Sequence, residues 1–219
     1  MGTMTVPPPS SAASQVGVVG MDLPMLPSLT YVFGVAGATG DKLRDAYYAH
    51  RLVMAMFPDV ETGQARASMG VLFRVTDDRK GLVVRGTVAP SRSVEGCRML
   101  GLLKEPAVRL GGVHSFELLA APTKRQDRDG QLSFLKAAQW PEWLDRHLLG
   151  AEVLDVACED RGEVRGFDLR RRGVVSYPSV RFTGLLRCDS VEGLQGVLAH
   201  GVGRGRSYGL GLLLLRAVG

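Results

Sequence analysis

The stretch Gly201-Val-Gly-Arg-Gly-Arg-Ser-Tyr-Gly-Leu-Gly-Leu-Leu213 decides how this 219-residue chain is interpreted. Its five glycines permit positive φ angles and let the backbone approach another backbone or a phosphate closely. Arg204 and Arg206 stand between the glycines and add positive charge where exposed amides already favour an anion. The pattern predicts a glycine-rich loop for an anionic ligand, and the alternative is a plain turn with solvated arginines.

The segments on either side predict that the loop joins a helix to the last strand. Asp189 and Ser190 are N-cap candidates for a helix over Val191–His200, and the apolar run 210–215 is typical of a buried strand. A Rossmann fingerprint needs its glycines after a strand and before a helix, which is the reverse order. A Walker-type loop needs a closing Gly-Lys-Ser/Thr, which does not occur here. Both nucleotide-binding motifs are therefore excluded.

The composition is that of a folded globular protein, with 45% hydrophobic and 22% charged residues, and the length allows one large or two small domains. The 27 Lys and Arg against 22 Asp and Glu give a net charge of +5, which favours an anionic partner. Neither the four histidines nor the cysteines Cys97, Cys158 and Cys188 show metal-ligand spacing, so we expect no metal and no cofactor.

Residues 1–27 are rich in proline, serine and glycine and predict a flexible N-terminal extension without the basic start of a signal peptide. No segment is apolar for the ~20 residues that a membrane span needs. We therefore expect a cytoplasmic protein that does not bind a membrane.

The first half of the remaining chain predicts a ferredoxin-like β-α-β-β-(α)-β unit over residues 28–110. A strand over 28–36 precedes a helix from Asp41, its N-cap, to about Phe57, on which Tyr47 and His50 share a face one turn apart. Two strands, within 70–76 and 82–88, follow around a polar turn. A short or degraded helix and one further strand are expected within 91–110.

The second half predicts the same order over residues 111–219, with a basic hairpin inserted. The predicted elements are a strand over 113–120, a loop over 126–131, a helix over 141–149, a strand over 152–158, a hairpin over 163–176, a strand over 179–187, and then the helix, glycine loop and final strand. The fold class is thus α+β, with two tandem ferredoxin-like domains.

Three motifs occur in a fixed order along the chain: Tyr47-x-x-His50-Arg-Leu-Val-x-x-x-Phe57-Pro-Asp, Val71-Leu-Phe-Arg-Val75, and Gly201-Val-Gly-x-x-Arg206-x-Tyr208-Gly-x-Gly211. Together they resemble the CasE (Cse3) family, the CRISPR precursor-RNA endoribonucleases of type I-E Cascade complexes. The segments 121–124 and 180–186 also look like that family. The N-terminal extension and a first strand poor in positive charge depart from its pattern.

The resemblance implies an endoribonuclease that cleaves CRISPR repeat RNA at the base of its hairpin and keeps the processed RNA as a subunit of Cascade. It implies two tandem ferredoxin-like domains, and it makes His50 and Tyr47 the catalytic residues, with Tyr48 as the substitute for Tyr47. Attack by the ribose 2′-OH on the adjacent phosphate needs no metal and leaves 2′,3′-cyclic phosphate and 5′-OH ends. A histidine with an ordinary pKa near ~6.5 suits either proton-transfer role at neutral pH, so base and acid both stay open.

The residues expected to bind RNA are basic or belong to the glycine loop: Arg204, Arg206, Gly203, Gly205, Arg170, Arg171, Arg172, Arg51 and Lys124. The three adjacent arginines in the predicted hairpin repel one another unless an anion binds, and the phosphates of an RNA stem would suit them. For every one of these charges the competing interpretation is a solvated surface.

Two other functions stay open from the residues alone. The first is a non-catalytic RNA-binding subunit with the same tandem domains. The second is an unrelated basic α+β domain whose glycine loop binds a small phosphorylated ligand.

Overall fold

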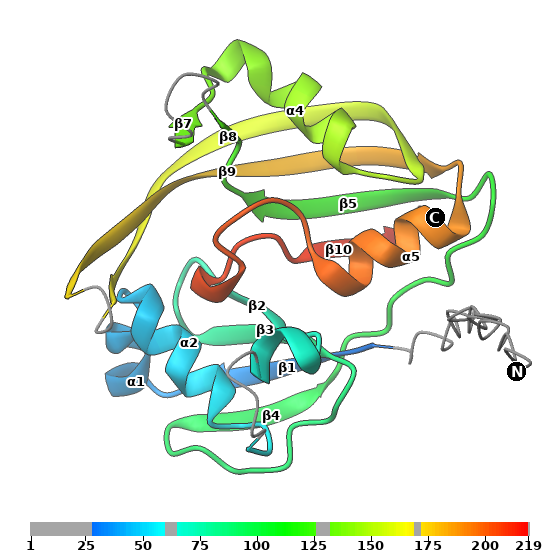
Figure 1. Cartoon of the computed structure of the whole chain (residues 1–219). Coiled ribbons are helices and arrows are strands. Elements are labelled where there is room, and N and C mark those ends of the chain that lie inside the picture. The colour runs from blue at the N-terminus through cyan, green and yellow to red at the C-terminus, as the bar shows by residue number, and fades with distance from the viewer. Residues whose placement is uncertain (1–27, 60–64, 126–131, 169–171, 219) are drawn as a thin grey trace, which may run out of the picture.

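The computed structural model describes residues 28–59, 65–125, 132–168 and 172–218, which form two four-stranded antiparallel sheets (Figure 1). In both sheets the strands follow the order of a ferredoxin-like fold, in which the first and third strands lie in the centre. The prediction of an α+β protein with two such units is confirmed. The division into domains at residues 28–110 and 111–219 stays a prediction, and residues 1–27 lie outside the described part.

The first sheet has the order β2-β3-β1-β4. Its strands are β1 (Leu29–Val35), β2 (Leu72–Val75), β3 (Gly81–Gly86) and β4 (Cys97–Leu102), and its helices are α1 (Gly37–Lys42), α2 (Ala46–Met54) and α3 (Ala65–Ser68). The strands expected within 28–36, 70–76 and 82–88 are confirmed. The helix expected within 91–110 is wrong, because this stretch, which is fully described, holds only β4 between turns.

The single helix expected from Asp41 to Phe57 is also wrong, because the chain forms α1 and α2 with a break between them. The break is at Asp45, whose side chain accepts hydrogen bonds from the backbone N–H groups of Tyr47 and Tyr48. An aspartate that caps the following turn in this way begins a new helix. The catalytic candidates therefore lie in the first two turns of α2.

The second sheet has the order β10-β5-β9-β8, with α4 and α5 on one face. Its elements are β5 (Val113–Ala120), the small hairpin of β6 (Thr123–Arg125) and β7 (Leu132–Phe134), the 3₁₀ turn η1 (Ala137–Gln139), α4 (Trp140–His147), β8 (Ala151–Asp168), β9 (Gly173–Cys188), α5 (Val191–His200), the 3₁₀ turn η2 (Arg206–Tyr208) and β10 (Leu213–Ala217). The predicted helix over Val191–His200 is confirmed, and its N-cap is Ser190. The loop expected over 126–131 lies outside the described residues.

The sequence predicts two short strands and a separate inserted hairpin between residues 152 and 187, and their separation is wrong. The structure has two long strands instead, β8 and β9, which pair from Ala151–Cys188 to Asp168–Gly173. A register shift between Asp160 and Glu163 bends the ladder, and Pro178 pairs with Glu163 next to this irregularity. The far end of this continuous hairpin reaches down beside α1 and α2 (Figure 1).

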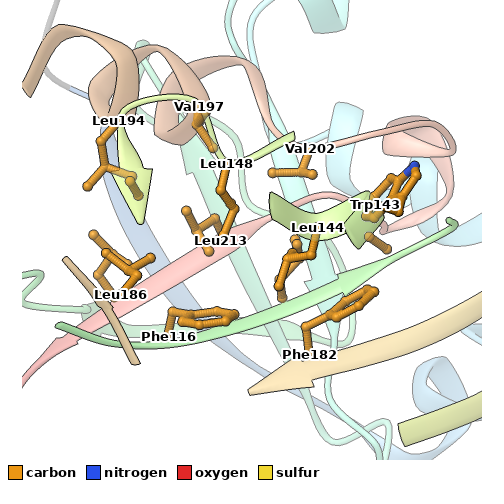
Figure 2. Packing of buried hydrophobic residues seen from close by; sticks show 14 of the residues in the cluster. Phe116, Trp143, Leu144, Leu148, Phe182, Leu186, Leu194, Val197, Val202 and Leu213 are labelled. Carbon is orange, nitrogen blue, oxygen red and sulfur yellow. The ribbon is translucent and has the colours of Figure 1, made fainter. Parts of the chain in front are cut away.

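The core of the second unit is the apolar layer between α4, α5 and the sheet (Figure 2). Trp143 of α4 is fully buried and stacks on Phe182 of β9, with ring centroids 5.9 Å apart. A second core lies beneath α2, where Val53 and Phe57 pack on Phe33 and Phe73. The apolar contacts between the two sheets come from Leu72, Leu212 and Leu214.

Candidate active site and nucleic-acid interface

His50 lies on α2 in the position that the sequence motif predicts, facing β2 of the same sheet. Its ring stacks on Phe73, with centroids 6.4 Å apart. Burial lowers the pKa of His50 below its usual value, and the positive charge of Arg66 lowers it further. The buried Nδ1 atom has no hydrogen-bond partner among the described residues.

The glycine loop packs against both units of the molecule. All five glycines have positive φ angles, between 70° and 84°. A Cβ built on Gly203 would lie 3.0 Å from the Trp143 ring, and one on Gly209 would lie 3.2 Å from Phe73. Gly205 lies as closely against Leu210, where a Cβ would be 2.8 Å from its Cδ1. Glycine is therefore needed here for close packing, and amide contacts of Gly203 and Gly205 with RNA stay a prediction.

Arg206 holds the loop to the end of α5 and lies near Arg66. Its Nη1 donates to the carbonyl of His200 at 2.6 Å. Arg66, on α3, donates from Nη1 to the carbonyl of Val71 at 3.0 Å. Burial lowers the pKa of Arg66, and the positive charge of Arg206 lowers it further. We call His50, Arg66 and Arg206 the basic cluster.

Tyr47 lies where α2 meets the long hairpin and the glycine loop. A Cβ on Gly166 of β8 would lie 2.6 Å from the Tyr47 backbone nitrogen and 2.9 Å from the Tyr208 ring. Tyr208 of η2 in turn contacts Tyr177 of β9, with ring centroids 5.5 Å apart. The N-terminal end of α2, the glycine loop and the hairpin therefore meet at one place.

The other basic candidates lie on four different parts of the chain. Arg51 is exposed on α2, and Lys124 is exposed on β6. Arg204 is exposed as well, and its backbone forms an isolated bridge with Ala121, just before β6. Arg172 is exposed at the turn before β9, with a φ of 48°. Arg170 and Arg171 lie outside the described residues.

Sequence reasoning missed Arg66 and the capping role of Asp45. Arg66 belongs to a polar segment without periodic pattern, so no motif singles it out. Asp45 follows Asp41 by one helical turn, and both are N-cap candidates by residue type. Within the described ranges, no group of three or more His, Cys, Asp or Glu side chains is placed to hold a metal ion. None of the described helices combines the length and apolar content needed to span a membrane.

The fold and the site define a class: two ferredoxin-like units that contact each other through a glycine loop of the second unit, with a basic cluster at that contact. A family model described as CRISPR associated protein matches residues 32–217, so the chain belongs to this family. The resemblance to the CasE (Cse3) family is confirmed by this family match and by the similarity of the fold to solved Cse3 and Cas6e structures. A search of curated proteins found no match.

Three solved structures show the fold similarity. The Thermus thermophilus Cse3 bound to an RNA representing a pre-cleavage complex has a TM-score of 0.71 and 23% identity, over 86% of this chain and 98% of that one. The CRISPR-associated protein Cas6e from Escherichia coli K-12 has a TM-score of 0.66 and 22% identity, over 87% and 100%. A chain of a CRISPR RNA-guided surveillance complex has a TM-score of 0.68 and 22% identity, over 87% and 100%.

Proposed function

We propose that this protein is a metal-independent endoribonuclease that cleaves CRISPR repeat precursor RNA at its hairpin and remains bound to the product as a Cascade subunit in the cytoplasm. The observation that carries the proposal is His50, half-buried on α2 against Phe73, with the charge of Arg66 acting on it and that of Arg206 acting on Arg66. The similar structures named above include an RNA-bound Cse3 and a chain of a surveillance complex, which supports both RNA binding and assembly.

The lowered pKa of His50 favours the base role, because the imidazole is then neutral at pH 7 and can accept a proton. In the proposed step His50 takes the proton of the ribose 2′-OH, and the 2′-oxygen forms a bond to phosphorus. The bond from phosphorus to the 5′-oxygen breaks, and the Tyr47 hydroxyl supplies the proton for that oxygen. The products are a 2′,3′-cyclic phosphate and a 5′-OH. His50 then releases its proton to solvent, and Tyr47 takes one up from solvent.

The test is incubation of the protein with a hairpin RNA transcribed from the CRISPR repeat, in the presence of EDTA. We expect one cut that leaves a 2′,3′-cyclic phosphate or its opened product, as read by mass spectrometry of the fragments. RNA with deoxyribose just upstream of the cut should bind and resist cleavage, since its nucleophile is missing. A strict need for Mg²⁺ or cleavage of the deoxy RNA would refute the mechanism. Binding without any cleavage would favour the non-catalytic RNA-binding subunit.

A further inference from the structure

Arg66 and Arg206 each bond to a backbone carbonyl next to the place where Leu72 of the first unit touches Gly201 of the second. Arg66 is bonded to the carbonyl of Val71, and Arg206 to that of His200. The residues that follow these carbonyls, Leu72 and Gly201, touch each other: a Cβ on Gly201 would lie 2.8 Å from a Leu72 methyl group. The two guanidinium groups are thereby fixed near each other by backbone acceptors.

His50 faces the same short stretch of β2. Its ring stacks on Phe73, the residue after Leu72, and Gly209 of the loop packs on the same phenyl ring. Contacts between α2 and η2, and between β2 and η2, join these parts of the chain. The imidazole and both guanidinium groups thus gather around residues 71–73.

The cluster differs from three other arginines between the units, each of which pairs with a described carboxylate. Arg74 pairs with Glu117, Arg85 with Glu105, and Arg181 with Asp77 and Glu117. Among the described residues, no carboxylate pairs with Arg66 or Arg206. Arg66 and Arg206 bond to neutral carbonyls, which leave the positive charge of each guanidinium uncompensated. An anion that binds here would neutralise the excess positive charge of the cluster.

We infer that Arg66 is a further catalytic residue, which together with Arg206 binds the non-bridging oxygens of the phosphate that is cut beside His50. This inference rests on the proposed function. Attack by the 2′-oxygen raises the negative charge at phosphorus, and guanidinium groups held in place by the protein stabilise that charge without reorganisation. Most of the affinity for RNA comes from contacts with the other phosphates of the stem. Arg66 should therefore affect the rate of cleavage more than RNA binding.

The experiment compares Arg66→Ala and Arg66→Lys with the wild type in single-turnover cleavage at saturating protein. We expect Arg66→Ala to slow cleavage by about 100-fold, the scale for loss of one such donor, with affinity for the deoxy RNA within a few-fold. Arg66→Lys should recover part of the rate, and added guanidinium ions should partly rescue Arg66→Ala. Arg187→Ala is the matched control, because Arg187 is an exposed arginine that pairs with Glu152 on the second sheet.

Arg66 also bonds Val71, so a structural role must be distinguished from a catalytic one. A melting temperature of Arg66→Ala close to that of the wild type, with slow and guanidinium-rescued cleavage, supports the inference. An unchanged cleavage rate overturns it, as does a slow variant that guanidinium does not rescue and whose affinity falls in parallel with the rate.

A second measurement separates this inference from the proposed function, because it uses no RNA. Inorganic phosphate is titrated into the protein while the imidazole signals of His50 are followed by NMR. We expect phosphate to raise the pKa of His50 in the wild type and to do so at least several-fold more weakly in Arg66→Ala. If phosphate shows this dependence but the RNA is never cut, the anion site stands and the nuclease proposal fails. If the RNA is cut but phosphate acts equally on both proteins, the role of Arg66 is refuted.

Discussion

His50 is the residue whose chemistry depends most on its surroundings. It lies on α2 only one turn after the Asp45 cap, where the helix backbone is fixed by the hydrogen bonds to Tyr47 and Tyr48. Its stacking on Phe73 removes part of the ring from water, and Arg66 adds a repulsive positive charge to the protonated form. Both effects favour the neutral imidazole, which is the form that accepts a proton.

The first prediction is a pH dependence of cleavage. A base is active above its pKa, so the rate at subsaturating protein should be constant above pH ~6.5 and fall only as pH decreases through the lowered pKa of His50. His50→Ala should be slower by ~100-fold or more and should keep RNA affinity within a few-fold. Single-turnover rates between pH 5 and 8, with binding measured on the deoxy RNA, provide the check.

Tyr47→Phe serves as the comparison, since it removes a hydroxyl and keeps the ring. A smaller loss of rate is expected if Tyr47 only orients the phosphate, and a comparable loss if it supplies the proton. A rate that rises as pH falls would assign His50 the acid role. Full activity of His50→Ala would remove it from the site.

Among the elements, those with strong local signals were predictable from the sequence. The strand ending near Ala36, β5 and α5 have apolar patterns and caps that the surrounding structure reinforces. The break before α2 was not predictable, because Asp41 and Asp45 are equally suited to cap a helix by residue type. The length of β8 and β9 was not predicted, because Gly162 and Pro178 are residue types that usually end strands. In the structure the two strands remain paired on both sides of these residues.

The residues of the candidate site also differ in how well the sequence alone predicts them. Tyr47, His50 and Arg206 belong to local motifs, and their residue types point to proton transfer and anion binding. Arg66 becomes notable only when α2, β2 and the glycine loop come together in space. Trp143 and Phe73, on which Gly203 and Gly209 pack, are likewise distant from the loop in the sequence. The close contacts that require glycine at these positions could therefore not be derived from the spacing of the glycines.

The second prediction concerns the glycine loop as an element. Gly203→Ala and Gly209→Val should each lower the free energy of unfolding by about 2 kcal/mol, since both residues combine positive φ with contacts of 3.0 Å to Trp143 and 3.2 Å to Phe73. Chemical denaturation of the full chain measures this change.

Gly196→Ala is the matched control for these glycines. It lies in α5 with no atom within 4 Å of a built Cβ, so alanine should leave stability unchanged or raise it by about 1 kcal/mol. RNA affinity that stays intact in the folded Gly209→Val protein would make the loop a packing element. Unchanged stability in Gly203→Ala would contradict the close contact with Trp143.

In the whole molecule, ionic contacts fix the two units relative to each other. Asp77, in the turn between β2 and β3, pairs with Arg181 of β9 and with Arg161 of β8. Arg74 of β2 reaches Glu117 of β5 at 2.6 Å. Because β2 also carries Phe73, on which the His50 ring stacks, these pairs set the position of α2 relative to the long hairpin. Their surface members contribute little stability singly, and their value is in orientation.

Arg85 makes the most buried of these connections, with its side chain 1% exposed. From β3 it donates to Thr30 Oγ1 at 3.0 Å, pairs with Glu105, and donates to the carbonyl of Leu198 on α5 at 3.0 Å. Leu198 lies two residues before His200, whose carbonyl holds Arg206. The same side chain therefore anchors the first sheet to the helix from which the glycine loop starts.

The third prediction is that Arg85→Met destabilises the protein by about 3–5 kcal/mol, the usual result of removing one partner of a buried ion pair. It leaves the Glu105 carboxylate and the Leu198 carbonyl without their partner, although methionine fills much of the space. Arg98→Met on β4, where the side chain is exposed, should change stability by less than about 0.5 kcal/mol.

At a temperature where Arg85→Met is still folded, cleavage should slow more than binding of the deoxy RNA weakens, because the end of α5 no longer fixes Arg206 near His50. An unfolding midpoint equal to that of the wild type, or a folded variant with an unchanged cleavage rate, would show that the junction is held without Arg85.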